Sequence, residues 1–146
     1  MIDRSARNSL CELIRGLASG LITNDEFEDN IPNSNDIAIM EVWSQGAWLL
    51  YDDLREYKLA GKDALTKEDK SMVARWILFL KSDNEYIWPN VEFKKRFLHA
   101  ISFGKFGQST LEAWKEVGDI YYWPFISSSQ LASAKKEVGY LGIQNT

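Results

Sequence analysis

The chain has 146 residues, a net charge of −4 and 45% hydrophobic residues, among them six tryptophans, six tyrosines and seven phenylalanines. This composition excludes a disordered chain and predicts a core built largely from aromatic rings. The acidic balance excludes a general nucleic-acid binder, which needs clustered lysine and arginine to displace counterions. Because domain sizes peak at about 100–150 residues, we expect one helical domain over residues 1–146.

The chain shows no targeting signal and no membrane segment. Residues Met1–Ser5 lack the apolar stretch of a secretory signal. The longest apolar runs, Ala47–Tyr51 and Trp76–Leu80, are too short to cross a bilayer. Cys11 is the only cysteine, so no intramolecular disulfide can form. These features predict a cytoplasmic protein without a membrane partner.

The N-terminal third of the chain predicts two helices. Apolar residues at the spacing of one helical face mark the first, which should end at Gly20: Leu10, Leu13, Ile14, Leu17 and Leu21. Thr23 and Glu26 then form the pattern of a capping box, in which each side chain bonds the other residue's backbone N–H. This box should open a short acidic helix, Asn24–Asn30, that stops before Pro32.

A longer helix is predicted next, capped by Ser34 or Asn35 and ended by Gly61. Its apolar residues repeat with alternating spacings of three and four: Met40, Trp43, Ala47, Leu50, Leu54 and Tyr57. This is the pattern of a coiled-coil-like seam about three heptads long, and it favours antiparallel packing in a bundle.

The second half of the chain also predicts helices. Thr66 and Asp69 should begin a central helix with apolar residues nearly all round, chiefly Met72, Val73, Trp76, Ile77 and Leu80. Further helices are expected around Phe93–Ile101 and Leu111–Val117, the latter ended by Gly118, and a last one after Ser127–Ser129. The fold class is therefore all-α, an irregular single-domain bundle of six or seven helices.

Two Tyr-x-Trp-Pro segments interrupt these helices. A residue before proline is pushed out of the helical region, so each segment should hold its tryptophan on a rigid turn. We expect Trp88 and Trp123 to be buried, with Asp83 and Asp119 as acceptors for their indole N–H groups. The residues of these structural aromatic turns are Tyr86, Trp88, Pro89, Tyr121, Trp123 and Pro124.

The sequence predicts no catalytic residue, no metal site and no cofactor. His99 is the only histidine, and no motif marks a partner carboxylate or an activated serine for it. Cys11 lies beside the apolar stripe of the first helix and should behave as a small hydrophobe. One cysteine and one histidine are too few for a typical zinc site, and Arg96 stands where a di-iron bundle needs glutamate. The segment Gly104–Thr110 lacks the residue order of a phosphate loop.

Two groups of carboxylates are the remaining chemical feature. They are Asp25, Glu28 and Asp29 on the acidic helix, and Asp52, Asp53 and Glu56 further along the chain. They can serve as solvated charges or as helix-terminal charges. The second role suits Asp25, because a helix N-terminus favours a negative charge. They can also form a binding surface for a cationic partner. A third interpretation is acid–base or magnesium chemistry. All three roles stay open at this point.

Three runs carry a resemblance over nearly the whole chain: Thr23–Asp29, Phe79–Pro89 and Gly118–Phe125. Their signatures, TNDEFED, FLxSDxxYxWP and GDxxxWPF, resemble those of an uncharacterised family of small bacterial helical proteins. The resemblance implies a bacterial cytoplasmic protein with a helical fold and architectural aromatic turns. It implies no activity.

The first functional interpretation is a non-catalytic protein-binding protein, an immunity or antidote protein that neutralises a cationic toxin in bacteria. Small size, an acidic domain and aromatic turns without a catalytic set fit it, and the acidic groups would steer a basic partner. One alternative is a hydrolase that uses carboxylates with magnesium. Another is a structural or regulatory subunit of a larger assembly. No pattern indicates the oligomeric state.

Overall fold

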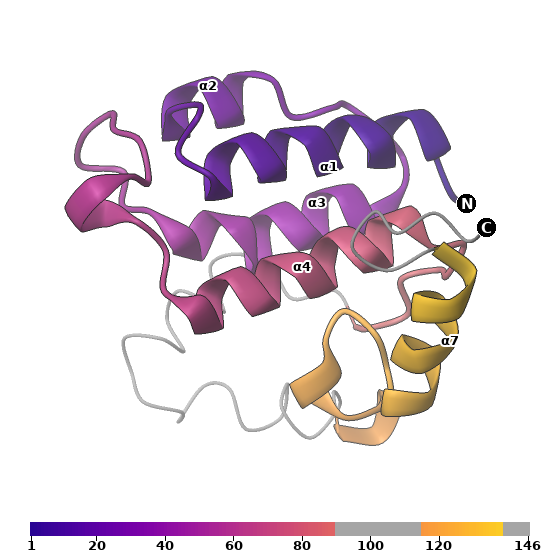
Figure 1. The fold of residues 1–146 in the computed structure, drawn as a ribbon. Coiled ribbons are helices and arrows are strands. Elements are labelled where there is room, and N and C mark those ends of the chain that lie inside the picture. The colour runs from indigo at the N-terminus through magenta and orange to yellow at the C-terminus, as the bar shows by residue number, and fades with distance from the viewer. Residues whose placement is uncertain (90–114, 139–146) are drawn as a thin grey trace.

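The computed structural model describes residues 1–89 and 115–138, and this part of the chain is an all-α bundle (Figure 1). The helices are α1 (Arg4–Ala18), α2 (Asn24–Asp29), α3 (Ile37–Gln45), α4 (Lys67–Lys81) and α7 (Ser128–Val138). Short 3-10 turns complete it: η1 (Ala47–Leu50), η2 (Gly61–Asp63) and η3 (Ile120–Tyr122). Helix α1 contacts α2, α3 and α4, and α4 also contacts α7. The all-α prediction is confirmed.

Helix α1 buries the predicted apolar face, with one exception at its end. Its N-cap is Asp3, whose carboxylate accepts from the Ala6 backbone N–H. Leu10, Ile14 and Leu17 are fully buried. Leu21 is instead 73% exposed, because the chain turns at Gly20 in the left-handed conformation (φ 75°) and leaves the helical face. The prediction that Leu21 belongs to this face was wrong.

The capping box of α2 is confirmed. The Thr23 hydroxyl accepts from the Glu26 backbone N–H at 3.1 Å, and the Thr23 backbone N–H donates to the Glu26 carboxylate at 3.4 Å. The helix ends at Asp29 with Asn30 as its C-cap, before Pro32, as expected.

The long helix predicted after Pro32 is wrong at both ends. Its N-cap is Asp36, whose carboxylate accepts from the Ala38 backbone N–H, rather than Ser34 or Asn35. Helix α3 already ends at Gln45, since Gly46 leaves the helical conformation (φ −118°, ψ −81°). A Cβ at Gly46 would lie 2.7 Å from the Val42 carbonyl oxygen and 3.2 Å from the Trp76 ring. The chain passes into η1 and then an irregular loop, so the predicted seam does not form. Two of its members are exposed, Met40 by 54% and Leu54 by 93%.

Helix α4 is central, as predicted. It runs between α1 and α7 in Figure 1. The Thr66 hydroxyl caps it by accepting from the Asp69 backbone N–H at 3.1 Å. Its buried residues are Val73, Trp76, Leu78, Phe79 and Leu80. Met72 lies at the edge of this face, 36% exposed. No helix of the described segments is long and apolar enough to cross a membrane.

An ion pair buried between α1 and α3 was not predicted. Arg7 Nε donates to Asp36 Oδ2 at 2.6 Å, and neither side chain is more than 1% exposed. Arg7 also donates to the Asn84 carbonyl at 2.9 Å and stacks over the Phe79 ring, 5.4 Å from its centroid. Burial alone would raise the pKa of Asp36, but the hydrogen bonds from Arg7 and from the Asp3 backbone outweigh it and lower that pKa. Arg7 extends the apolar stripe of α1 three residues before Leu10, which is the sequence signal for its burial.

The two aromatic turns interlock. Trp88 and Trp123 are 3% and 8% exposed, so their predicted burial is confirmed. The predicted acceptors are wrong, since each indole bonds the opposite turn. Trp88 Nε1 donates to the Pro124 carbonyl at 2.9 Å, and Trp123 Nε1 donates to the Tyr86 hydroxyl at 3.0 Å. Asp119 instead caps η3, and Asp83 pairs with Arg4 at 2.6 Å.

The two tyrosines of these turns differ. Tyr86 is buried and its hydroxyl donates to the buried Glu41 carboxylate at 3.4 Å, which also accepts from Gln45. Tyr121 is 72% exposed. The Trp123–Pro124 bond is cis, whereas the Trp88–Pro89 bond is not. The repeated motif therefore produces two unequal turns.

The last helix, α7, begins after Ser127, whose hydroxyl accepts from the Gln130 backbone N–H. Gly118 follows the helical residues 115–117, and a Cβ there would lie 2.4 Å from the Ile126 carbonyl oxygen. Position 118 therefore requires glycine because the backbone of Ile126 lies so close, and not because the residue adopts a positive φ. Several predictions lie outside the described residues. They concern the helix around Phe93–Ile101 with Arg96 and His99, the segment Gly104–Thr110, the cap of the Leu111–Val117 helix and the end of the last helix.

Candidate functional site

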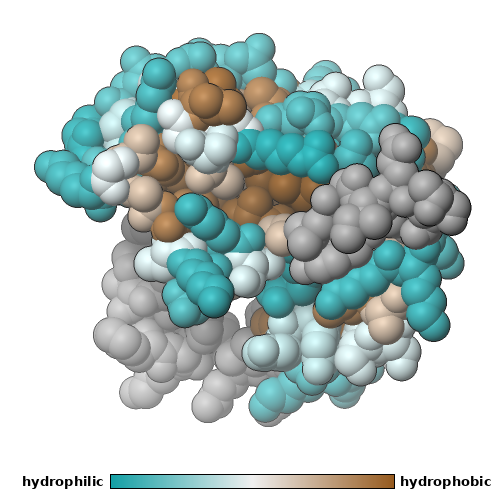
Figure 2. All heavy atoms as spheres, in the orientation of Figure 1, coloured by the Kyte–Doolittle hydropathy of each residue, from teal (hydrophilic) through white to brown (hydrophobic). Residues whose placement is uncertain are grey.

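The fold brings the two predicted acidic groups together on one exposed surface, which we call the acidic face. Asp25, Glu28 and Asp29 lie on α2, and Asp52, Asp53 and Glu56 lie in the loop after η1. Glu28 is half-buried and the other five are exposed. On the side shown in Figure 2, hydrophilic residues cover much of the end of the molecule formed by α2 and this loop, around a small hydrophobic patch beside α2.

Asn24 holds the two segments together. It is 1% exposed, and its side-chain amide donates to the carbonyls of Asp52 at 3.2 Å and Arg55 at 3.0 Å. Its side-chain oxygen accepts from the Tyr57 backbone N–H at 2.9 Å, and its own backbone N–H donates to the Tyr57 carbonyl at 3.2 Å. A buried amide with all these bonds made fixes the loop firmly against α2.

Side-chain hydrogen bonds orient four of the six carboxylates. The Thr23 hydroxyl donates to Glu56 at 2.7 Å, and the Tyr51 hydroxyl donates to Glu28 at 2.6 Å. Burial, and then the bond to Glu28, raises the pKa of Tyr51, so this phenol stays a donor.

In the loop, Asp52 accepts from the Leu54 backbone N–H at 3.0 Å, and Asp53 accepts from Trp48 Nε1 at 3.1 Å. Asp25 and Asp29 accept no hydrogen bond to their side chains from any residue that the structure describes. These two carboxylates are therefore oriented by the helix alone.

The acidic face is electrostatically unfavourable on its own. The pKa of Asp25 is raised, first because the adjoining protein displaces part of its hydration, and then by the negative charges of Glu56, Asp29 and Asp53. Arg55, a cation of the same loop, pairs with Asp63 at 3.1 Å and stacks on the Tyr57 ring at 4.1 Å. Repulsion between the two acidic groups is thus only partly offset within the chain.

The described part of the chain contains no cluster of three or more His, Cys, Asp or Glu side chains arranged to hold a metal ion. The six carboxylates are therefore spread over a surface and do not converge on one point. Burial raises the pKa of the Cys11 thiol to about 11, and its sulfur lies 3.8 Å from the Ile77 carbonyl oxygen. Such a thiol is a poor nucleophile, as its position beside the apolar stripe predicted.

Sequence reasoning identified the six carboxylates but not the residues that assemble them. Asn24 stands directly after the capping residue Thr23, where nothing distinguishes it from an ordinary first residue of a helix. Tyr51 lies next to Asp52 and Asp53, and this run of an aromatic residue and two acids at the end of a helical pattern is the one available signal.

Comparisons of the chain with protein-family models, with curated proteins and with solved structures gave no match. The resemblance to small bacterial helical proteins of unassigned function therefore stays a prediction.

Proposed function

We propose that this protein is a non-catalytic binding protein whose acidic face takes a cationic partner protein. The observation that carries the proposal is the convergence of two acidic groups, about thirty residues apart in sequence, on one surface fixed by Asn24. Two of the carboxylates, Asp25 and Asp29, are exposed and accept no hydrogen bond within the described residues. A partner lysine or arginine would relieve the repulsion that raises the pKa of Asp25.

The acidic face is suited to fast, selective association. Complementary charge steers diffusional encounter and raises association rates, while like charge suppresses wrong partners. Because Asn24, Thr23 and Tyr51 already hold the loop and two of the glutamates, binding would cost little ordering of the acidic face. The exposed Leu54 side chain, in the same loop, would add apolar contact at the rim.

In its finer form, the proposal is an immunity or antidote protein in a bacterium. Toxins that act on nucleic acid carry clustered Lys and Arg that bind phosphates. A rigid acidic surface can cover such a cluster and block the toxin. The small size of the chain and its net charge of −4 support this form.

A pair of charge-reversal variants tests the proposal. Asp25→Lys with Asp29→Lys should weaken the partner complex at least about tenfold and reduce its salt dependence, with only a small change in melting temperature, because neither side chain accepts a hydrogen bond from a described residue. Glu116→Lys with Glu137→Lys is the matched control, since it makes the same charge change at exposed positions outside the acidic face.

Where a neighbouring gene encodes a basic protein, that protein is the first partner to titrate, by surface plasmon resonance in low and high salt. Equal affinity of the Asp25/Asp29 variant and the wild type would contradict the acidic face as the binding surface. The antidote form would fall if the wild-type protein bound the neighbour's product without inhibiting it.

A further inference from the structure

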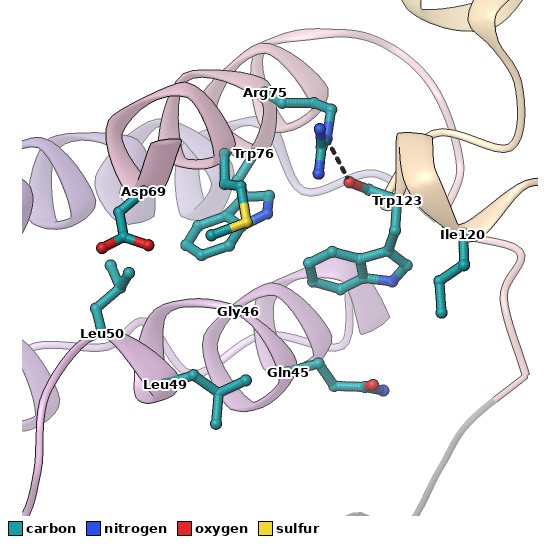
Figure 3. Close-up of a pocket in the computed structure, with 10 residues that line it drawn as sticks. Gln45, Gly46, Leu49, Leu50, Asp69, Arg75, Trp76, Ile120 and Trp123 are labelled. Carbon is teal, nitrogen blue, oxygen red and sulfur yellow. Dashed lines mark hydrogen bonds between the residues drawn. The ribbon is translucent and has the colours of Figure 1, made fainter. Parts of the chain in front are cut away.

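A cavity of about 270 Å³ lies between the end of α3, helix α4 and turn η3 (Figure 3). Its walls are mainly apolar, with Leu49, Leu50, Met72 and Ile120 around the indoles of Trp76 and Trp123. The two indoles meet edge to face, with centroids 6.2 Å apart. Small-molecule sites are mostly apolar clefts of this kind with a few placed polar groups.

Arg75 brings a positive charge to the cavity, and no described residue forms an ion pair with it. Its guanidinium is half-buried, and burial lowers its pKa. Its Nε donates to the Trp123 carbonyl at 2.8 Å, which leaves both terminal NH₂ groups without a hydrogen bond or an ion pair among the described residues. Figure 3 shows the guanidinium above the space between Trp76 and Trp123. A guanidinium with unpaired terminal groups at the edge of an apolar cavity can form charge-assisted hydrogen bonds with an anionic ligand.

Trp76 lines the cavity with its ring. The residue is 4% exposed, and its indole N–H has no acceptor in the part of the chain that the structure describes. Because protein atoms enclose this N–H, the donors that a ligand in the cavity can reach are those of Arg75.

The opposite end of the cavity is acidic. Asp69 lies six residues before Arg75 on α4, which places it about 9 Å away along the helix axis. At that separation its carboxylate does not pair with the guanidinium. It would repel a second negative charge on a ligand and would accept a hydrogen bond from a neutral or cationic end.

We propose that this cavity binds a small monocarboxylate with an apolar body of about the size of an aromatic ring. The carboxylate would accept charge-assisted hydrogen bonds from the terminal NH₂ groups of Arg75. The body would lie against the indoles and Leu49, and its far end, near Asp69, would carry no negative charge. This site is separate from the acidic face, so neither proposal depends on the other.

The probe for this site is 4-phenylbutyrate, titrated into ¹⁵N-labelled full-length protein at constant pH. We expect saturable shifts of the Trp76 indole N–H and the Arg75 Nε–H resonances. The neutral analogue 4-phenylbutanol should bind at least about tenfold more weakly, because it cannot accept charge-assisted bonds. A dicarboxylate of similar length should also bind more weakly, owing to Asp69.

Two variants sharpen the test. Arg75→Gln should lower the affinity for 4-phenylbutyrate about tenfold while 4-phenylbutanol is unaffected. Met72→Glu should lower the affinity for 4-phenylbutyrate by placing a negative charge at the cavity. Met40→Glu, at an exposed position that does not line the cavity, should leave this affinity unchanged. If Arg75→Gln fails to fold, the comparison of Met72→Glu with Met40→Glu still tests whether the ligand binds in this cavity.

The proposal is overturned if no saturable shift appears, if the alcohol binds as well as the acid, or if Met40→Glu weakens binding as much as Met72→Glu. Equal binding of acid and alcohol would mean an apolar cavity without anion selectivity.

Discussion

The protein gathers charged side chains at two places and uses them in opposite ways. Between α1 and α3, Arg7 and Asp36 are buried, 0% and 1% exposed, and face each other at 2.6 Å. On the acidic face, carboxylates of one sign lie in solvent, and the pKa of Asp25 is raised by lost hydration and then by their repulsion. The first place has balanced charge and many hydrogen bonds, and the second has unbalanced charge and exposed oxygens.

This difference separates charges that specify the fold from charges left for a partner. Removing two charges from water is costly, so a buried pair persists only where further hydrogen bonds satisfy both groups. Asp36 also accepts from the backbone N–H groups of Asp3 and Ala38, and Arg7 donates to the Asn84 carbonyl. The pair thereby sets how α1, α3 and the end of α4 meet. Among the described residues, no donor or cation satisfies the carboxylate of Asp25 or Asp29 in this way, so a partner can still neutralise them.

The largest expected effect comes from opening the buried pair. Asp36→Ala leaves the Arg7 guanidinium buried without its counter-ion and removes the cap of α3, so it should lower the free energy of unfolding by about 3–5 kcal/mol. Urea denaturation followed by circular dichroism measures this loss.

The matched control is Glu12→Ala, which removes a surface ion pair with Arg15 whose side chains are 68% and 50% exposed. It should cost less than about 1 kcal/mol. Similar losses in the two variants would show that burial does not distinguish these pairs.

The aromatic turns offer the same contrast between buried and exposed groups without charge. Tyr86→Phe removes the acceptor of the Trp123 indole N–H, so we expect a loss of about 1–3 kcal/mol in the free energy of unfolding. Tyr121→Phe, at the equivalent position of the other motif, should change it by less than about 0.5 kcal/mol, because Tyr121 is 72% exposed. Equal losses would mean that the two turns are equivalent after all.

A smaller effect should appear in the pH dependence of stability. The pKa of Asp36 is lowered in the folded state, so its contribution is complete above the unfolded-state pKa and is lost as the pH falls through the lower folded-state pKa. The stability difference between the wild type and Asp36→Asn should therefore shrink as the pH is lowered from neutrality into this acidic range. Urea midpoints of both proteins measured over this range test it, and a constant difference would contradict it.

The smallest effect is expected on the acidic face. Because the pKa of Asp25 is raised, its ionised form is disfavoured in the folded protein at neutral pH. Asp25→Asn should therefore raise the melting temperature slightly in low salt, and the gain should shrink in high salt, where the repulsion from the neighbouring carboxylates is screened. Differential scanning calorimetry at two salt concentrations measures it. Glu116→Gln, an exposed carboxylate outside the acidic face, should show no gain.

Much of the fold could be predicted where a pattern is complete within one turn of helix. The Thr23 and Thr66 caps and the apolar face of α1 depend on residues three or four positions apart, and the structure has them as expected. The cap of α3 could not be predicted in the same way. Ser34, Asn35 and Asp36 are all good caps, and Asp36 takes the position in a setting where its carboxylate also meets Arg7, 29 residues away.

The seam predicted over residues 40–57 failed for a related reason. Its spacing is that of a helix, but Gly46 lies against Val42 and Trp76 so closely that no larger residue fits, and the helix ends there. The close neighbour Trp76 comes from α4, thirty residues later, so the local pattern contained no sign of it. For the candidate site, the carboxylates were visible in the sequence, while their assembly by Asn24 and Tyr51 was not.

By itself, the sequence determined the helical class of the protein, the caps of two helices, the apolar face of α1 and the burial of both tryptophans in the aromatic turns. These features follow from hydrogen bonds and hydrophobic spacing within a few residues. Only the tertiary structure decided that the two acidic groups share one face and that each turn supplies the acceptor for the other's indole. Those outcomes depend on pairs about thirty to forty residues apart, such as Asn24 with Arg55 and Tyr86 with Trp123, whose contact is set by the packing of whole helices.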